Sequence, residues 1–315
     1  MNRWPAELWD EVARFACVDG GYTGCSLALV SRSMHDATRH SRHHSVSLTN
    51  EHKLFAFARR TLEGERAPAC IGHLFIAVDL VAGMEPEGRK PSQAIQDAFA
   101  AIFACAAPGL EGLTVYSQWK RANEFIESLC ESLTFPGLLD LVLPAPVSLP
   151  VASAFPAVRR FHAYSVADIE TYTVVETIAP AFPLLTHLRF SEAPKHRGFY
   201  LWADQTSGTE YDLDTGDVAA ALPSLRAIIV PRCPWRPTTL ETEHQAAMNN
   251  SHRRTRNVDR GVGPLYLRSD SSGYGVAEAK REWLDMVAGG EGPWSTKHAE
   301  QPYIPGRYLD NSATF

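Results

Sequence analysis

The clearest indication of the fold is the stretch Pro136-Gly137-Leu138-Leu139-Asp140-Leu141-Val142-Leu143, because its pattern recurs along the chain. A proline opens the pattern, and large apolar residues follow two, five and seven positions later. The last two apolar positions are separated by a single residue, which is typical of a short strand. Other copies begin at Pro108, Pro183 and Pro223, weaker ones at Ile71 and Pro156, and a shortened one at Pro264.

Segments with apolar residues at helical spacing separate most of these copies. We expect helices over residues 92–106, 122–133, 169–178 and 276–287. Strands that alternate with helices along a repeating chain are typical of a parallel-strand solenoid, so the predicted fold class is α/β.

The spacing of the copies is uneven. From Leu113 to Leu188 the equivalents of Leu141 are 28, 20 and 27 residues apart, close to the period of about 20–29 residues of leucine-rich repeats. The steps on either side are longer, so we expect two insertions, a hairpin near 196–217 and a loop at 236–261. The pattern predicts an irregular leucine-rich-repeat-like solenoid.

The first sixty residues predict a separate helical module. Pro5 suits the first position of a helix, Thr23 and Ser31 are candidate caps of two more helices, and Asn50 is the candidate cap of a fourth. A short strand is expected at 45–48. The expected domains are the module with its connecting helix at 1–63, the solenoid at 64–288 and an irregular tail at 289–315.

The overall composition argues against several classes of protein. A net charge of −6 and a pI of about 6.1 give no support for a basic nucleic-acid surface. The first residues include no apolar signal region, and the least charged stretch, 94–110, is too short and polar to span a bilayer. We expect a cytoplasmic or nuclear protein with six reduced cysteines and with no membrane or nucleic-acid partner.

No motif predicts catalysis. The stretch Asp212-Leu213-Asp214-Thr215-Gly216 contains the Asp-Thr-Gly triplet of aspartic proteases, but Glu210 and Asp217 crowd it, which is typical of a solvated turn. Four histidines lie between residues 35 and 44, among arginines that oppose a bound cation. We predict no catalytic residue, no metal ligand and no cofactor.

Two stretches of the N-terminal module match a known pattern. They are Trp4-Pro5-Ala6-Glu7-Leu8-Trp9-Asp10-Glu11-Val12 and Cys25-Ser26-Leu27-Ala28-Leu29-Val30-Ser31-Arg32-Ser33-Met34. Together they resemble the F-box, whose pattern is Leu-Pro-x-Glu-(Leu/Ile), then Leu-x-x-Val-(Ser/Cys)-(Arg/Lys) and a bulky residue. The resemblance covers residues 4–48, and the run 17–27 is similar to the variant abundant in mushroom-forming fungi. The sequence departs from the pattern at Trp4, where Leu is usual, and at Met34, where Trp is common.

The resemblance implies a substrate receptor of an SCF-type ubiquitin ligase. The F-box would dock on a Skp-type adaptor, and through it on a cullin, while the solenoid would hold an unknown target protein. Docking would bury apolar side chains that the module's own core leaves over. Alternatively, the same residues pack on the first repeat of the solenoid. The adaptor-facing positions implied by the resemblance are Pro5, Leu8, Val12, Leu29, Val30 and Met34.

A solenoid would also present one concave face made by its parallel strands. The candidate residues on that face are Val142, His187 or Arg189, and Ile229. Two other functions stay open. One is an interaction scaffold outside any ligase, because two residues depart from the F-box pattern, and the other is a hydrolase of unrecognised type acting through Asp214.

Overall fold

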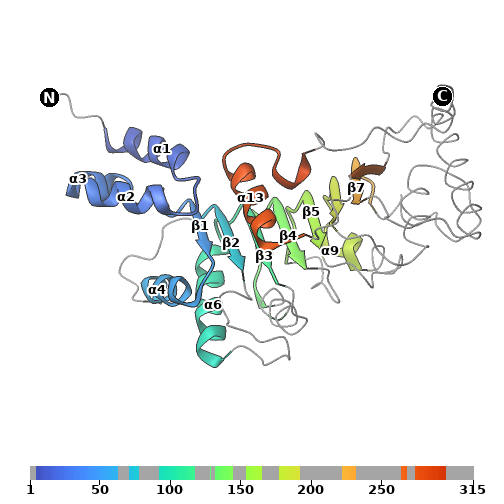
Figure 1. Cartoon of the computed structure of the whole chain (residues 1–315), viewed down its shortest axis with the longest axis horizontal. Helices are drawn as coiled ribbons and strands as arrows, with labels where there is room; N and C mark the ends of the chain where they lie inside the picture. The colour runs from blue at the N-terminus through green and yellow to red at the C-terminus, as the bar shows by residue number, and fades with distance from the viewer. Residues whose placement is uncertain are drawn as a thin grey trace, which may run out of the picture.

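Within the residues that the computed structural model describes, eight strands form one parallel sheet in which the spatial order is the chain order. The described residues are 5–62, 71–77, 92–117, 128, 132–144, 154–164, 177–191, 222–231, 264–267 and 274–295. Helices alternate with several of the strands, so the chain is an α/β protein (Figure 1). The strands are β1 Ser45–Leu48, β2 His73–Ala77, β3 Gly112–Tyr116, β4 Asp140–Pro144, β5 Arg160–Tyr164, β6 His187–Phe190, β7 Ala227–Pro231 and β8 Pro264–Leu267.

Strands β2 to β8 coincide with the copies of the repeated sequence pattern, and β1 coincides with the separate strand expected at 45–48, which confirms the strand predictions. The register aligns equivalent residues, since Leu141 pairs with Leu113 on one side and with Phe161 on the other. The helix expected over 92–106 is present as α6 (Gln93–Ala106), and Ser92 caps it. The helices expected over 122–133 and 169–178 lie mostly outside the described residues, and the insertions near 196–217 and 236–261 lie wholly outside them.

The loop before each of the strands β2 to β7 is tied to the preceding loop by a pair of hydrogen bonds. The Glu111 carbonyl accepts from the backbone N–H groups of Leu139 and Asp140, at 2.9 and 3.1 Å. The Leu139 carbonyl accepts in turn from Arg159 and Arg160, at 3.0 and 3.1 Å. The same backbone geometry therefore returns from repeat to repeat. It recurs at the carbonyls of His44, Gly72, Arg159 and Thr186.

One face of the sheet carries an apolar row and the main core. The paired residues Leu74, Leu113 and Leu141 of this row are fully buried. Helices α4 (Glu51–Leu62) and α6 cover this face (Figure 1). A ladder of phenylalanine rings runs alongside, with successive centroids 6.2, 5.5 and 5.7 Å apart. The rings are those of Phe103, Phe135, Phe155 and Phe182.

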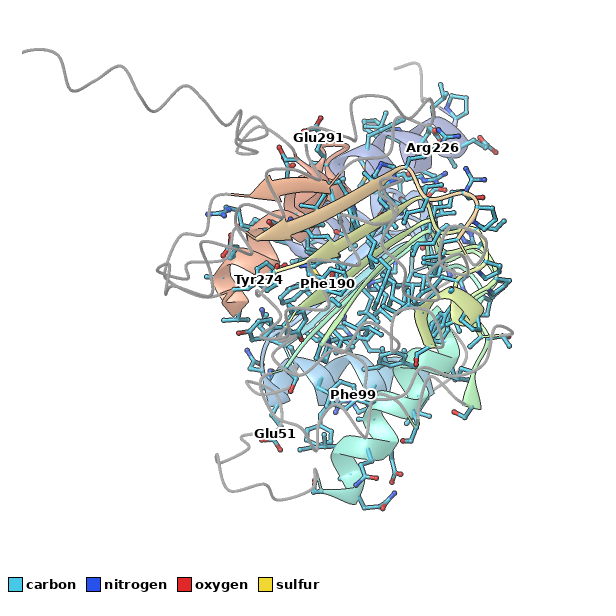
Figure 2. All side chains as sticks on the ribbon, turned by 90° about the vertical axis from the view of Figure 1, so that its right-hand side faces the viewer. Glu51, Phe99, Phe190, Arg226, Tyr274 and Glu291 are labelled. Carbon is cyan, nitrogen blue, oxygen red and sulfur yellow. The ribbon has the colours of Figure 1, made fainter. Side chains whose placement is uncertain are left out.

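Helices α13 (Val276–Val287) and η3 (Gly292–Trp294) lie on the opposite face (Figure 1). Figure 2 shows Phe99 of α6 and Tyr274, just before α13, on the two sides of the sheet. The bounds of the helix at 276–287 agree with the prediction. The expectation that it continues the strand–helix alternation is wrong, because it packs on the face that we expected to be free. In the tail expected at 289–315, residues 296–315 lie outside the described part.

The N-terminal module consists of α1 (Ala6–Ala16), α2 (Tyr22–Val30) and α3 (Arg32–Ala37), and it lies beyond the β1 edge of the sheet (Figure 1). Two predicted caps are confirmed, because Ser31 Oγ accepts from the Met34 N–H and Asn50 Oδ1 from the Lys53 N–H. The predicted cap at Thr23 is wrong. Helix α2 already begins at Tyr22, and the carboxylate of Asp19 accepts from the N–H and hydroxyl of Thr23, at 2.9 and 2.6 Å.

Candidate docking surface

The turn between α1 and α2 fixes the module to the first strand. The Gly20 N–H donates to Ser45 Oγ at 3.0 Å, and the same hydroxyl donates to the Cys17 carbonyl at 2.6 Å. The Ser47 N–H donates to the Gly20 carbonyl at 3.2 Å. Gly20 has a φ of +79°, a conformation that glycine adopts without strain. The position of the module is therefore set by hydrogen bonds to β1.

The three helices of the module enclose very little apolar core. A Cβ atom at Gly24 would lie 2.1 Å from the Arg42 carbonyl oxygen, so α2 rests directly on the backbone that follows α3. The Ser41 N–H donates to Asp10 Oδ1 at 3.2 Å. The buried residues of α1, α2 and α3 are only Ala13 and Gly24. Most of the large apolar side chains of these helices therefore have little interior to enter.

Those side chains lie on the outside of the module. Five of the six positions implied by the resemblance are exposed: Pro5, Leu8 (51%), Val12 (46%), Leu29 (87%) and Val30 (68%). The sixth, Met34, is half-buried. The alternative that these residues pack on the first repeat is wrong for the exposed five. Exposed apolar side chains gathered on one small unit mark an interaction site more often than an ordinary surface.

Two further aromatic side chains extend this surface, and the sequence analysis did not assign them. Phe15 is 74% exposed and Tyr22 is 78% exposed, on either side of the turn between α1 and α2. Phe15 continues the helical stripe of Leu8 and Val12, so the stripe was the signal that could have found it. Tyr22 is the first residue of α2 and belongs to no helical stripe, so the sequence pattern did not indicate it. We call the seven exposed residues the module surface: Pro5, Leu8, Val12, Phe15, Tyr22, Leu29 and Val30.

The histidines between residues 35 and 44 do not form a metal site. The ring of His43 meets Phe57 and that of His44 meets His73, with centroids 5.6 and 5.1 Å apart. Burial, with neighbouring arginines, lowers the pKa of His43 to about 4, and burial next to His44 lowers the pKa of His73 to about 4. Within the described residues no group of three His, Cys, Asp or Glu side chains could hold a metal ion. No helix in the same part of the chain is long and apolar enough to cross a membrane.

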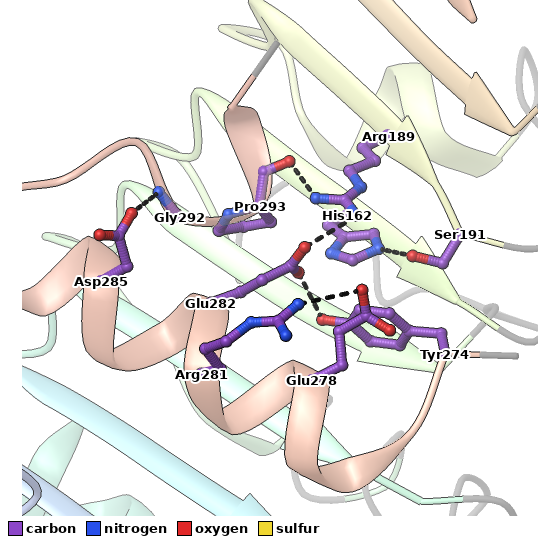
Figure 3. Close-up of polar contacts among 10 residues, drawn as sticks. All are labelled: His162, Arg189, Ser191, Tyr274, Glu278, Arg281, Glu282, Asp285, Gly292 and Pro293. Atoms are coloured by element: carbon purple, nitrogen blue, oxygen red, sulfur yellow. Dashed lines mark hydrogen bonds and ion pairs between the residues drawn. The ribbon is translucent and has the colours of Figure 1, made fainter. Parts of the chain in front are cut away.

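A buried polar network lies between α13 and the sheet (Figure 3). Arg189 of β6 forms an ion pair with Glu282 of α13, with 2.9 Å between Nη2 and Oε1. The Arg189 guanidinium also donates to the Pro293 carbonyl of η3. The Tyr274 hydroxyl donates to the second Glu282 oxygen at 2.9 Å. A single arginine of the sheet thus binds both C-terminal elements.

The expectation of a free concave face is wrong for the described strands. Val142, Arg189 and Ile229 are 2%, 6% and 1% exposed, and His187 is half-buried, with its ring centroid 6.0 Å from that of Trp294. Val142 belongs to the apolar cluster that α13 completes. Helices α13 and η3 lie over this face at Val142, His187 and Arg189, so a target cannot reach these three residues in the observed conformation.

His162 and Ser191 lie close enough to resemble a catalytic base and nucleophile, but their surroundings do not fit that role. His162 Nε2 lies 2.6 Å from Ser191 Oγ. In a catalytic pair the other ring nitrogen is oriented by a carboxylate, but His162 Nδ1 has no partner in the described structure. Burial, with Arg189 nearby, lowers the pKa of His162 well below its ordinary value, which makes it a weak base. The contact is structural. Asp214, the residue of the hydrolase alternative, lies outside the described residues.

No protein-family model, curated protein or solved structure matches the chain. The described structure contains two candidate interaction sites, the module surface and the sheet face under α13. The first is open and the second is covered.

Proposed function

We propose that the chain is the substrate-recognition subunit of an SCF-type ubiquitin ligase, in which the N-terminal module is an F-box that docks on a Skp-type adaptor. The observation that carries the proposal is the exposure of the module surface. Five of the residues that the F-box resemblance assigns to the adaptor are exposed apolar side chains on a module with almost no core of its own.

The energetics of such a surface favour a protein partner. Burying one Leu, Val or Phe side chain is worth roughly 1.5–3 kcal/mol. Leu8, Phe15, Tyr22 and Leu29 each leave about half or more of their surface in water in the free chain. An apolar partner groove would recover much of this free energy. The adaptor in turn would connect the chain to a cullin.

The strand array supports the second half of the proposed role. Eight parallel strands in chain order, joined by a recurring backbone geometry, fit an irregular leucine-rich-repeat-like solenoid. Repeat arrays of this kind hold protein ligands on extended surfaces. We propose that the array holds a target protein for ubiquitin transfer, that the chain itself is not an enzyme, and that it acts in the cytoplasm or nucleus without nucleic acid, membrane or cofactor.

The proposal is tested by a pull-down of a purified Skp-type adaptor with the tagged full chain. The wild type should retain the adaptor, and the Pro5→Ala/Leu8→Asp double variant should lose it while its circular dichroism is unchanged. Leu184→Asp is the matched control, because Leu184 is also an exposed leucine (47%) but lies far from the module, in the turn before β6. Equal retention by all three proteins, or by none, would contradict the proposal.

A second candidate function is an interaction scaffold that never enters a ligase. The specific observation in its favour is the pair of departures from the F-box pattern, at Trp4 and Met34. Met34 is half-buried against its own module, so it presents less surface than the other assigned positions. In this case the module surface binds a different apolar partner, and the adaptor is not retained.

A further inference from the structure

The two faces of the sheet differ in their chemistry. Toward α4 and α6 the central cross-strand row is apolar throughout. On the other face, Thr114, His162 and Arg189 lie in the equivalent row, and the whole row is buried. A buried charged side chain is uncommon unless a partner was selected for it. We call this row the polar row, after its four polar members; from β1 to β7 its residues are Ser47, Phe75, Thr114, Val142, His162, Arg189 and Ile229.

The main core of the molecule does not depend on α13. That core contains apolar residues from Val46 to Leu225 and none from the segment 274–295. Helix α13 instead completes a second, smaller cluster on the polar face, together with Phe75 and Tyr164. The sheet therefore keeps its main core when α13 leaves it, which makes α13 and η3 a separable unit.

Helix α13 contacts the polar face in the way that a bound peptide does. Trp283 is 1% exposed, and its ring centroid lies 5.6 Å from that of Phe75. The preceding residue, Glu282, pairs with Arg189 in a site where the two side chains are only 13% and 8% exposed. A buried aromatic anchor beside one desolvated charge pair is the usual composition of an interface hot spot.

The segment does not satisfy every polar group that it covers. Thr114 Oγ1, His162 Nδ1 and Arg189 Nε are buried without a hydrogen-bond partner in the described structure, and so is the indole N–H of Trp283. An unpaired buried polar group costs about 1–3 kcal/mol. The cost of these unpaired groups offsets part of the free energy gained by burying apolar surface under α13. A segment that forms hydrogen bonds with them can therefore compete with α13 for the polar face.

We propose that α13 and η3 are an intramolecular ligand of a peptide-binding face, and that a target protein binds there by replacing them. The target segment is a helix with a carboxylate for Arg189 and, beside it, a tryptophan-sized ring for the space over Phe75. This inference rests on the target-holding half of the proposed function. In the absence of such a target segment, α13 and η3 cover the binding face of this chain.

The test uses the full chain and a fluorescent synthetic peptide of residues 274–295 as the probe. Three proteins are compared: the wild type, the Glu282→Gln/Trp283→Ala variant with a weakened cover, and Arg281→Gln as the matched control. Arg281 lies on the same helix, with its side chain 75% exposed. The tethered cover acts at an effective concentration on the order of 1 mM, so the wild type should bind the peptide weakly. The weakened cover should bind it at least about tenfold more tightly, and Arg281→Gln should match the wild type.

Hydrogen exchange of the wild type supplies the second readout, in case the weakened variant unfolds. Amides of α13 should exchange through an opening that leaves α6 protected. The inference is overturned if α13 exchanges only together with α6. It is also overturned if a folded weakened variant ignores the peptide, or if a peptide carrying Glu282→Gln/Trp283→Ala binds equally well. Adaptor retention by the wild type is scored separately, so failure of adaptor docking and failure of this inference are distinguishable.

Discussion

Gly24 is the residue on which the packing of the module depends most directly. Its backbone lies against the Arg42 carbonyl, and a Cβ atom there would be 2.1 Å from that oxygen. The obstacle is main chain, so no rotamer change relieves it. The direction of α2, and with it the placement of Leu29 and Val30, follows from this contact.

Replacement of Gly24 by alanine should therefore destabilise the module. We expect Gly24→Ala to cost about 1–3 kcal/mol and to raise hydrogen exchange in α2, because α2 must move away from Arg42. The control is Gly137→Ala, where the new Cβ would be 3.5 Å from the Leu110 carbonyl and where the equivalent residue of the next repeat is Ala157. Urea unfolding should show a change below about 0.5 kcal/mol for the control. Equal effects of the two substitutions would refute the assigned contact.

Two half-buried histidines, His43 and His73, should make the chain less stable in mild acid. The pKa values of His43 and His73 are about 4 in the folded chain, against an ordinary value of 6.5. Between these values the unfolded chain binds more protons than the folded chain, so stability falls as the pH is lowered from about 6.5 toward 4 and levels off below that. Each histidine should account for about 1–2 kcal/mol between pH 7.5 and pH 5.

The measurement for the histidines is urea unfolding at pH 7.5 and pH 5. The variants His43→Gln and His73→Gln should each lose part of the pH dependence of the wild type. His40→Gln is the control, because His40 is exposed. If the wild type and both variants share one pH dependence, these residues are not the groups that titrate.

At the scale of elements, the phenylalanine ladder holds consecutive repeats together. The rings of Phe135 and Phe155 are stacked, with centroids 5.5 Å apart and an angle of 15° between their planes. Phe182 continues the ladder at 5.7 Å from Phe155. Neighbouring repeats are thus joined in two ways, by the contact between their phenylalanine rings and by the pairing of their strands.

Truncation in the middle of the ladder should be severe. Phe155 is fully buried, so we expect Phe155→Ala to cost about 3–5 kcal/mol in urea unfolding of the full chain. Leu184→Ala is the control, since that leucine is about half exposed in the turn before β6, and its effect should stay within about 0.5 kcal/mol. A loss below about 1 kcal/mol for Phe155→Ala would mean that the ladder is not a stabilising element.

Local elements were predictable and their tertiary placement was not. The strands and the caps at Ser31 and Asn50 follow from short-range patterns, and the structure contains them. The apolar spacing of Trp283, Leu284 and Val287 predicts a helix, but such a stripe packs on either face of a sheet. The covering of the concave face could therefore not be foreseen. The close approach at Gly24 is likewise a relation between distant parts of the chain.

At the scale of the whole molecule, the exposed module surface and the polar face of the sheet that α13 covers lie in different parts of the chain. The module surface lies beyond β1 at one end of the sheet, and the polar face extends from β1 to β6 under α13 (Figure 1). Five of the seven residues of the module surface could be predicted, because the F-box resemblance assigned them to the adaptor. The structure adds that their side chains are exposed. Phe15 lies on the same helical stripe as Leu8 and Val12, which marks it as a candidate, but a stripe does not show that the core beneath it is too small to bury it. Tyr22 lies on no stripe, so no sequence pattern indicated it.

The central claim is that the module surface binds a Skp-type adaptor. The most direct measurement is the affinity of the purified adaptor for the full chain by biolayer interferometry, with the wild type beside Leu29→Asp, at the most exposed residue of the module surface. We predict a wild-type Kd of about 1 μM or tighter and a loss of at least about 30-fold for Leu29→Asp, with unchanged circular dichroism. A wild type that does not bind the adaptor, or a Leu29→Asp variant that binds it as tightly, would contradict the account.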